Sequence, residues 1–160
     1  MADAAVINAS PLIFLSRSGN LELLHGFAKS IWLPEPVFKE ILARGSNDPT
    51  VQAVQQTAWL IERPVTDIPI EILEWRLGKG ESSVLALAME SNNEAIIDDL
   101  QGRKCAASLN IPVRGTLGIV LTAKRREMIP AARPVIEDMM KAGLYLSKKV
   151  LDQALAKVGE

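Results

Sequence analysis

Short apolar runs alternate with helix-length segments along this chain, and this alternation constrains the fold more than any other feature. Apolar, partly β-branched runs occur at residues 4–7, 31–33, 95–97 and 111–113, with a weaker run around 60–65. Strands that are separated by helices are joined by crossover connections, which give a mainly parallel sheet covered on both faces. Pro64 cannot donate to a strand ladder, so its run is predicted at the edge of the sheet. The sequence therefore predicts an α/β fold.

The helical segments are recognised by their start and stop signals. Ser10-Pro11 predicts an N-cap followed by proline in the first turn, and Asp48-Pro49 predicts another helix start. Glu81 is predicted to open a strongly apolar helix directly after Gly80. The expected helices cover residues 12–27 with a break around Gly19, 36–42, 49–59, 70–77, 81–89, 101–109, 115–128, 134–142 and 147–158.

The composition fits one compact domain over residues 1–160, because no internal repeat or long linker divides the chain. The net charge of −1 gives no global positive field, so nucleic acid would need a local basic patch. Cys105 is the only cysteine, which excludes an intramolecular disulfide and a cysteine-based zinc site. The N-terminus lacks a basic signal-peptide start, and no apolar run approaches the roughly 20 residues of a membrane span. We therefore expect a cytoplasmic protein with no membrane contact.

Polar side chains are predicted to gather outside the carboxyl ends of the strands, where open parallel sheets bind ligands. Asn8 follows the first strand, and Asp98 and Asp99 follow the strand at 95–97. Glu40 lies on the helix after the second strand, and Glu81 begins the helix that precedes the Asp98 strand. Four acidic groups and one amide would thus meet on one rim.

Carboxylates gathered on one rim repel one another, and a bound divalent cation relieves that repulsion. Ligand sets made only of oxygen favour Mg²⁺ or Mn²⁺ over zinc. Such an ion can activate a water and stabilise the leaving oxygen during phosphodiester cleavage. The rim therefore predicts metal-dependent phosphodiester hydrolysis, for which no protein nucleophile is needed.

Each rim residue also has an ordinary structural interpretation. Glu81 suits the first turn of a helix, where a negative charge complements the helix dipole. Glu40 suits a solvent-exposed helix position, and both Asn8 and Asp98-Asp99 suit turns. The joint placement of these residues at one sheet edge, rather than any one of them, favours a functional site.

Five stretches of the chain together resemble the PIN-domain family, in particular its uncharacterised branch related to VapC toxins. Their order and approximate spacing agree with the family across about 6–145, nearly the whole chain. The stretches are Val6-Ile7-Asn8-Ala9-Ser10-Pro11-Leu12-Ile13, Leu33-Pro34-Glu35-Pro36-Val37-Phe38-Lys39-Glu40, Gly78-Lys79-Gly80-Glu81-Ser82, Ile97-Asp98-Asp99 with Arg103, and Arg114-Gly115-Thr116-Leu117-Gly118.

The resemblance implies a three-layer α/β/α fold with a mainly parallel central sheet, a metal-dependent ribonuclease activity, and a role as the toxin of a toxin–antitoxin pair. Glu40, Glu81 and Asp98 match acidic positions of the family. Asp99 is the alternative to Asp98, because the strand end aligns either way by one residue. Thr116 matches a small hydroxyl position that binds water or phosphate.

Ser10 and Arg103 lie in the matching stretches and, with Thr116, are the residues expected to contact substrate. One rim residue departs from the family pattern. PIN domains usually carry aspartate after the first strand, where this chain has Asn8. An amide oxygen can bind a metal ion, but it brings no negative charge.

The sequence favours an endoribonuclease for single-stranded RNA, with Mg²⁺ or Mn²⁺ held by Glu40, Glu81, Asp98 and Asp99 and with Asn8 as a ligand or orienting group. Three other functions stay open. They are a PIN fold that binds RNA or a partner with weak or no catalysis, a hydrolase of small phosphate esters in a closed pocket, and a metal-free interaction protein.

A homodimer or an antitoxin complex is also expected, because apolar side chains are dense between residues 12 and 27. Exposed apolar patches of that kind mark protein interfaces. The alternative for the same side chains is simple burial in the core.

Overall fold

The computed structural model describes residues 2–160 and has a five-stranded parallel sheet at its centre. The strand order is β3-β2-β1-β4-β5, and every pairing between neighbours is parallel. The sheet edges are therefore β3 and β5. The strands are β1 (Ala2–Ile7), β2 (Ala28–Pro34), β3 (Leu60–Arg63), β4 (Glu94–Ile96) and β5 (Val113–Arg114).

Helices fill the connections between the strands and the C-terminal part of the chain. Within residues 2–160, every helix is too short or too polar to cross a bilayer. The helices are α1 (Ala9–Arg17), α2 (Glu22–His25), α3 (Glu35–Leu42), α4 (Pro49–Gln56), α5 (Ile70–Leu73), α6 (Lys79–Ser91), α7 (Leu100–Ser108), α8 (Thr116–Arg125), α9 (Ala132–Lys141) and α10 (Lys148–Ala156).

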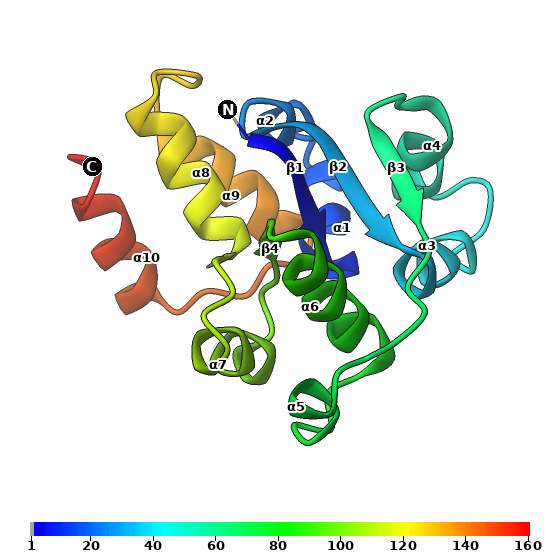
Figure 1. The fold of residues 1–160 in the computed structure, drawn as a ribbon. Coiled ribbons are helices and arrows are strands. Elements are labelled where there is room, and N and C mark those ends of the chain that lie inside the picture. Colours follow the sequence, from blue (N-terminus) through cyan, green and yellow to red (C-terminus); the bar gives the residue numbers. More distant parts are fainter. Residues whose placement is uncertain (1) are drawn as a thin grey trace.

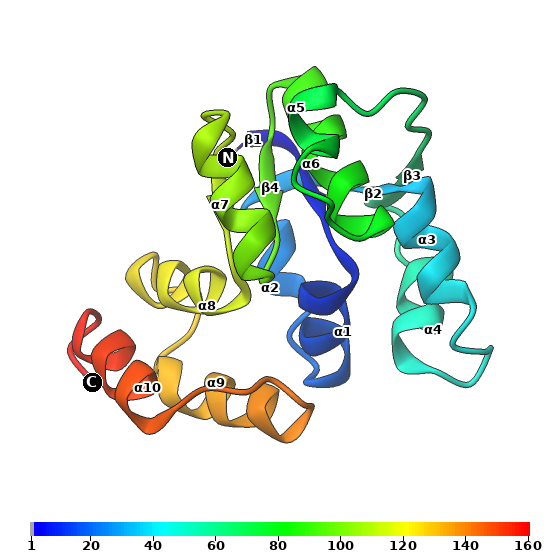
Figure 2. The same cartoon turned by 90° about the horizontal axis from the view of Figure 1, so that it is seen from below.

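The helices cover both faces of the sheet, which confirms the predicted α/β/α layers (Figures 1 and 2). On one face α6 packs against β1, β2 and β4, and α1 lies on the opposite face beside α8 and α9. Every residue of α6 from Ser82 to Ala88 is buried. A helix that is apolar nearly all round must be covered on most sides. The sheet, α3, α5 and α7 supply this cover.

The direction in which the chain adds strands reverses between β1 and β4. The strands β2 and β3 lie on one side of β1, whereas β4 and β5 lie on the other. Ile7 of β1 is paired with Ile96 of β4, and the Asn8 N–H donates to the Ile96 carbonyl at 2.9 Å. Open α/β sheets bind ligands outside the strand ends at such a reversal. Asn8 and Asp98 both leave the sheet at this point.

The predicted strands and helices are all present, but several of their ends differ. The prediction of Ser10 as an N-cap is wrong, because the chain passes from β1 straight into α1 with Asn8 as the N-cap, which leaves Ser10 exposed in the first turn. The last strand starts at Val113 rather than residue 111, since the Ile111 N–H bonds the Ala106 carbonyl at the end of α7. The helix expected over 70–77 ends at Leu73, shortly before Arg76 adopts a left-handed φ of 53°.

The apolar side chains between residues 12 and 27 belong mainly to the core. Leu12, Leu15 and Leu24 have no exposed surface at all. Burial within the monomer therefore explains why apolar side chains are dense here. The homodimer is no longer supported by this observation, and it stays a prediction. More exposed apolar side chains occur on α5, where Ile70 is 62% and Leu73 is 50% exposed.

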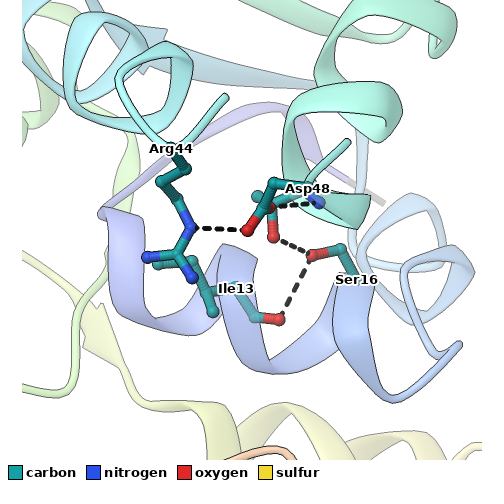
Figure 3. Close-up of polar contacts among 5 residues, drawn as sticks. Ile13, Ser16, Arg44 and Asp48 are labelled. Carbon is teal, nitrogen blue, oxygen red and sulfur yellow. Dashed lines mark hydrogen bonds and ion pairs between the residues drawn. The ribbon is translucent and has the colours of Figure 1, made fainter. Parts of the chain in front are cut away.

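A hydrogen-bond network holds α4 against α1 (Figure 3). Asp48 caps α4, and its carboxylate accepts the Thr50 N–H at 2.8 Å and Arg44 Nε at 3.0 Å. The Thr50 hydroxyl is fully buried and lies 2.7 Å from Ser16 Oγ. Ser16 Oγ in turn donates to the Ile13 carbonyl at 3.2 Å, so Thr50 is the donor to Ser16. The network joins α1, the loop after α3, and the start of α4.

Asp48 is the residue of this network whose charge can be tested. Burial raises the pKa of Asp48, but hydrogen bonds from the Thr50 N–H and Arg44 outweigh that effect, so the pKa lies below its ordinary value. A depressed pKa means that the charged form contributes stability above the unfolded-state value of about 3.9, and that this contribution is lost as the pH falls.

We predict that Asp48→Ala lowers the free energy of unfolding by about 1 kcal/mol at neutral pH, because the cap is lost. Asp48→Asn keeps a capping oxygen and loses only the charge, so its loss is smaller. Urea unfolding at neutral pH and in acid checks both variants. The gap between wild type and Asp48→Asn should close in acid, and an equal gap at both pH values would contradict the assignment.

Candidate functional site

The carboxyl edge of the sheet brings the predicted polar side chains together from several elements. Asn8 follows β1, Asp98 follows β4, and Thr116 begins α8 shortly after β5. Glu40 lies on α3 and Glu81 lies in the first turn of α6, and these two helices pack against each other. Because β1, β4 and β5 are neighbours spaced by about 4.8 Å, the three strand-end residues follow one another along this edge.

The side chain of Asn8 is buried beside Glu40 and Glu81. Only 4% of Asn8 is exposed, and its Nδ2 donates to Glu81 Oε1 at 3.4 Å. Within residues 2–160, the Asn8 Oδ1 atom meets no hydrogen-bond donor. A buried acceptor without a partner costs roughly 1–3 kcal/mol. A cation or a ligand donor at this atom would remove that cost.

Gly80 leaves open the space that Asn8 and Glu40 face. A Cβ atom at Gly80 would lie 3.2 Å from Asn8 Oδ1, 3.4 Å from Glu40 Oε2 and 3.6 Å from Val37 Cγ2. The two oxygen atoms thus border one small space beside the first turn of α6. Any larger side chain at position 80 would fill it.

This space belongs to a pocket of about 490 Å³ between α3 and α6, called here the α3–α6 pocket. Its lining comprises Pro36, Lys39, Glu40 and the segment 78–81. Both Lys39 and Lys79 are exposed at its rim. Lys39 also donates to Glu35 at 2.6 Å, and this hydrogen bond lowers the pKa of Glu35. The pocket therefore combines the carboxylates of Glu40 and Glu81 with exposed ammonium groups.

Asp98 is held at the next position along the edge by Thr116. The Thr116 N–H donates to Asp98 Oδ1 at 2.8 Å, and the Thr116 hydroxyl donates to Asp98 Oδ2 at 2.6 Å. Thr116 is fully buried and is the first residue of α8. The Asp98 carboxylate thus lies at the N-terminus of α8, where the helix dipole favours a negative charge. Its orientation is fixed by both contacts.

Asp99 and Ser10 lie at the margin of the site. Asp99 caps α7, since its Oδ2 accepts the Gly102 N–H at 2.8 Å, and its side chain is exposed. Ser10 is exposed on α1. Among the described residues, neither side chain forms a hydrogen bond with Asn8, Glu40 or Glu81.

The acidic side chains do not form one closed cluster. Across residues 2–160, no three acidic, histidine or cysteine side chains stand together in a set that could hold a metal ion. Glu40 and the Asn8 amide border the space at Gly80, and Glu81 adjoins that amide from the side of Gly78, whereas both oxygens of Asp98 are bonded to Thr116. The oxygen atoms nearest that space therefore carry two carboxylate charges rather than three.

Comparison with known families identifies the chain. The family model DUF3368, described as a PIN domain, matches residues 4–160. The chain belongs to the PIN-domain family. No curated protein matches it. Among solved structures, a PilT N-terminus domain protein from the hyperthermophilic archaeon Sulfolobus solfataricus P2 is similar at 14% identity and a TM-score of 0.45, with 90% of this chain and 97% of that chain covered.

PIN domains are generally nucleases and typically use divalent metals. The donor atoms of this PIN domain fit such an ion in two respects. Asn8 Oδ1 is buried without a donor, and Gly80 leaves space between that atom and Glu40. Oxygen ligands from carboxylates and an amide suit Mg²⁺ or Mn²⁺.

Sequence reasoning missed Lys39, Lys79 and Gly80 as parts of this PIN-domain site. The stretch 78–82 contributes to the family resemblance, and a site role is predicted only for its Glu81. The helix start was placed at Glu81, whereas α6 starts at Lys79 and takes Gly80 into its first turn. Two glycines one residue apart, just before an acidic residue at a helix start, are the signal that could have indicated a close approach of side chains.

We predict that Thr116→Val lowers the free energy of unfolding by about 1.5–3 kcal/mol, because the half-buried Asp98 carboxylate loses its hydroxyl donor. Thr116→Ser keeps that donor and loses one methyl group, so its loss should be about 1 kcal/mol or less. Denaturant unfolding in the presence of a chelator measures both variants. A valine variant as stable as wild type would show that the hydroxyl does not hold Asp98.

Proposed function

We propose that this PIN domain is a metal-dependent endoribonuclease that acts on single-stranded RNA. The observation that carries the proposal is the buried Asn8 Oδ1, which has no donor among the described residues and faces Glu40 across the space left by Gly80. Glu81 adjoins the same amide. This arrangement suits a ligand that accepts electron pairs from oxygen, and a hard divalent cation is such a ligand.

Mg²⁺ or Mn²⁺ would be held by Glu40, Glu81 and Asn8. Asp98 would act through water, because both of its oxygens already accept hydrogen bonds from Thr116. When bound, the ion would neutralise charge on the phosphoryl oxygens and lower the pKa of a coordinated water. Asp99 is left out of this ligand set, since it caps α7.

The rim of the α3–α6 pocket supports an anionic polymer as the substrate. Lys39 and Lys79 line the pocket and are exposed, as is Glu40. Ammonium groups on a rim attract phosphates without sequence preference. A pocket that is open in this way favours a strand passing over it rather than a small phosphate ester enclosed by the protein, as the phosphatase-like alternative would require.

A second candidate function is an RNA- or partner-binding module with weak catalysis. Asn8 favours it, because the aspartate that usually follows the first strand of a PIN domain would add a charge beside the metal. The absence of a third acidic group from the Gly80 space, among residues 2–160, favours it as well. Cleavage and binding assays on one protein preparation separate the two functions.

The role as the toxin of a toxin–antitoxin pair is the finer part of the proposal and rests on the resemblance to VapC-like proteins. Its test is co-purification of a small partner protein with this chain from the native host. The partner must also suppress RNA cleavage, so a partner that leaves cleavage unchanged would count against the toxin role.

We predict that Mn²⁺ or Mg²⁺ raises the melting temperature of the wild-type protein and enables cleavage of labelled single-stranded RNA, and that a chelator removes both effects. Glu81→Gln should reduce both strongly, because one ligand charge is lost. Glu90→Gln is the matched control, since Glu90 is exposed on the same helix and lies outside the α3–α6 pocket.

Gly80→Ala tests the location of the metal ion more directly than Glu81→Gln does. A Cβ atom there enters the space between Asn8 Oδ1 and Glu40 Oε2, so the metal-dependent rise in melting temperature should disappear. The apo protein should stay folded, because alanine is favoured over glycine inside a helix by about 1 kcal/mol. If Gly80→Ala responds to metal as the wild type does, the ion is bound elsewhere.

We predict that Asn8→Asp binds Mn²⁺ more tightly and cleaves RNA faster at limiting metal, because it adds a charge at the ion. The apo variant should melt lower than wild type. Aspartate lacks the amide that donates to Glu81 and would stand beside it as a like charge, at a cost of about 1 kcal/mol. Calorimetric titration and thermal melts with chelator measure the two effects. Unchanged affinity and rate would place position 8 outside the metal shell.

A further inference from the structure

A second pocket of about 430 Å³ lies between α7, α8 and α10, at the β5 edge of the sheet. It is called here the α7–α8–α10 pocket. The residues that matter for its chemistry are Arg103, Leu117, Leu121, Val150, Gln153 and Lys157. Among residues 2–160, no acidic side chain lines it. In this respect it is the opposite of the α3–α6 pocket, and it suits an anionic ligand.

The cationic side chains of this pocket differ in whether they already form hydrogen bonds or ion pairs within the protein. Arg114 is occupied, since its guanidinium bonds Glu94 at 2.6 Å and the Thr122 hydroxyl at 2.6 Å. Arg103 and Lys157 are exposed, and within residues 2–160 neither forms an ion pair or a side-chain hydrogen bond. Two cations without partners in one concave site, beside a neutral amide from Gln153, suit a phosphate group.

The rest of the pocket lining is apolar. Leu117 and Leu121 come from α8, and Val150 comes from the facing helix α10. Flat rings bind well on apolar surface beside a guanidinium plane, and unstacked RNA bases are recognised in this way. The volume lies within the ordinary range for small-molecule sites. An apolar wall with a basic rim matches one nucleotide better than a bare anion.

Gly115 connects this pocket with the Asp98 position. A Cβ atom on Gly115 would collide with Arg103 Nη1 and would lie 3.0 Å from Asp98 Oδ1. Arg103 Nη1 and Asp98 Oδ1 therefore border the same small space beside Gly115, and Arg103 also lines the pocket. A strand whose phosphodiester lies at Asp98 has its neighbouring nucleotide within reach of this arginine.

The position of α10 is fixed by contacts on both sides. Ala154 and Leu155 are buried, and α10 packs against α8. After the helix, the Glu160 carboxylate accepts the N–H groups of Ala132 and Arg133 at 2.7 and 3.1 Å, which ties the segment after α10 to the start of α9. Lys157 and Gln153 are thus presented by an anchored helix.

We propose that the α7–α8–α10 pocket binds one nucleotide of single-stranded RNA, adjacent to the phosphodiester that is cleaved. Arg103 and Lys157 contact its phosphate, and the apolar wall receives its base. This inference rests on the proposed nuclease function and adds α10 to the substrate-binding surface.

The test compares Arg103→Ala and Lys157→Ala with Lys149→Ala. Lys149 is an exposed lysine of α10 that does not line the pocket, so its replacement changes the net charge equally. Fluorescence anisotropy with a labelled octaribonucleotide, in chelator to prevent cleavage, gives the affinity and its salt dependence. Each pocket variant should bind about tenfold more weakly, with the salt slope reduced by about 0.7. Lys149→Ala should bind as the wild type does.

Cleavage with Mn²⁺ separates the failure of this inference from failure of the nuclease proposal. The pocket variants should raise KM for the octaribonucleotide, with little change for a dinucleotide that cannot reach the pocket. Pocket variants that bind and cleave like Lys149→Ala overturn the inference while leaving the nuclease intact. A wild type that never cleaves RNA overturns the nuclease function, whatever the binding data. Free nucleoside monophosphate that binds as tightly as the octaribonucleotide overturns the RNA assignment in favour of a free-nucleotide site.

Discussion

The pairing of β1 with β4 is the contact on which the rest of the site depends. It places a strand from the middle of the chain beside the first strand, and so reverses the direction in which strands are added. The Asn8 N–H closes this pairing by donating to the Ile96 carbonyl. As a result the residues that follow both strands emerge at one edge, where Asn8 and Asp98 become neighbours although they are far apart in sequence. Without this pairing, neither α6 nor α8 would bring its N-terminus to the same edge.

The acidic side chains of the site differ in whether backbone N–H groups donate hydrogen bonds to them. Asp98 and Asp99 are each stabilised by N–H groups at the start of a helix, α8 for one and α7 for the other. Within residues 2–160, no backbone N–H group donates to Glu40 or Glu81, and the only side-chain donor that reaches either of them is Asn8 Nδ2, at 3.4 Å. The unsatisfied part of the site is therefore confined to the space around Gly80. That is where a ligand has the most to contribute to stability.

The chain carries no overall positive charge, yet cations flank the acidic edge at both ends. Lys39 and Lys79 line the α3–α6 pocket, and Arg103 and Lys157 line the α7–α8–α10 pocket. The net charge of −1 does not reveal these local groups of cations, because it sums the charges without regard to their positions. Local cations beside a site can guide an anionic polymer onto it without any global field.

The sequence by itself determined the order and kind of the elements and the edge position of β3. It also indicated that Asn8 and Asp98 follow buried strands. These features depend on residue patterns within a few positions, so neighbouring side chains suffice to encode them. Only the tertiary structure decided that β4 lies beside β1, that Asp98 rather than Asp99 contacts Thr116, and that Gly80 opens the space beside Asn8. Each of these depends on how elements distant in sequence bury their apolar faces together, and no local pattern records that choice.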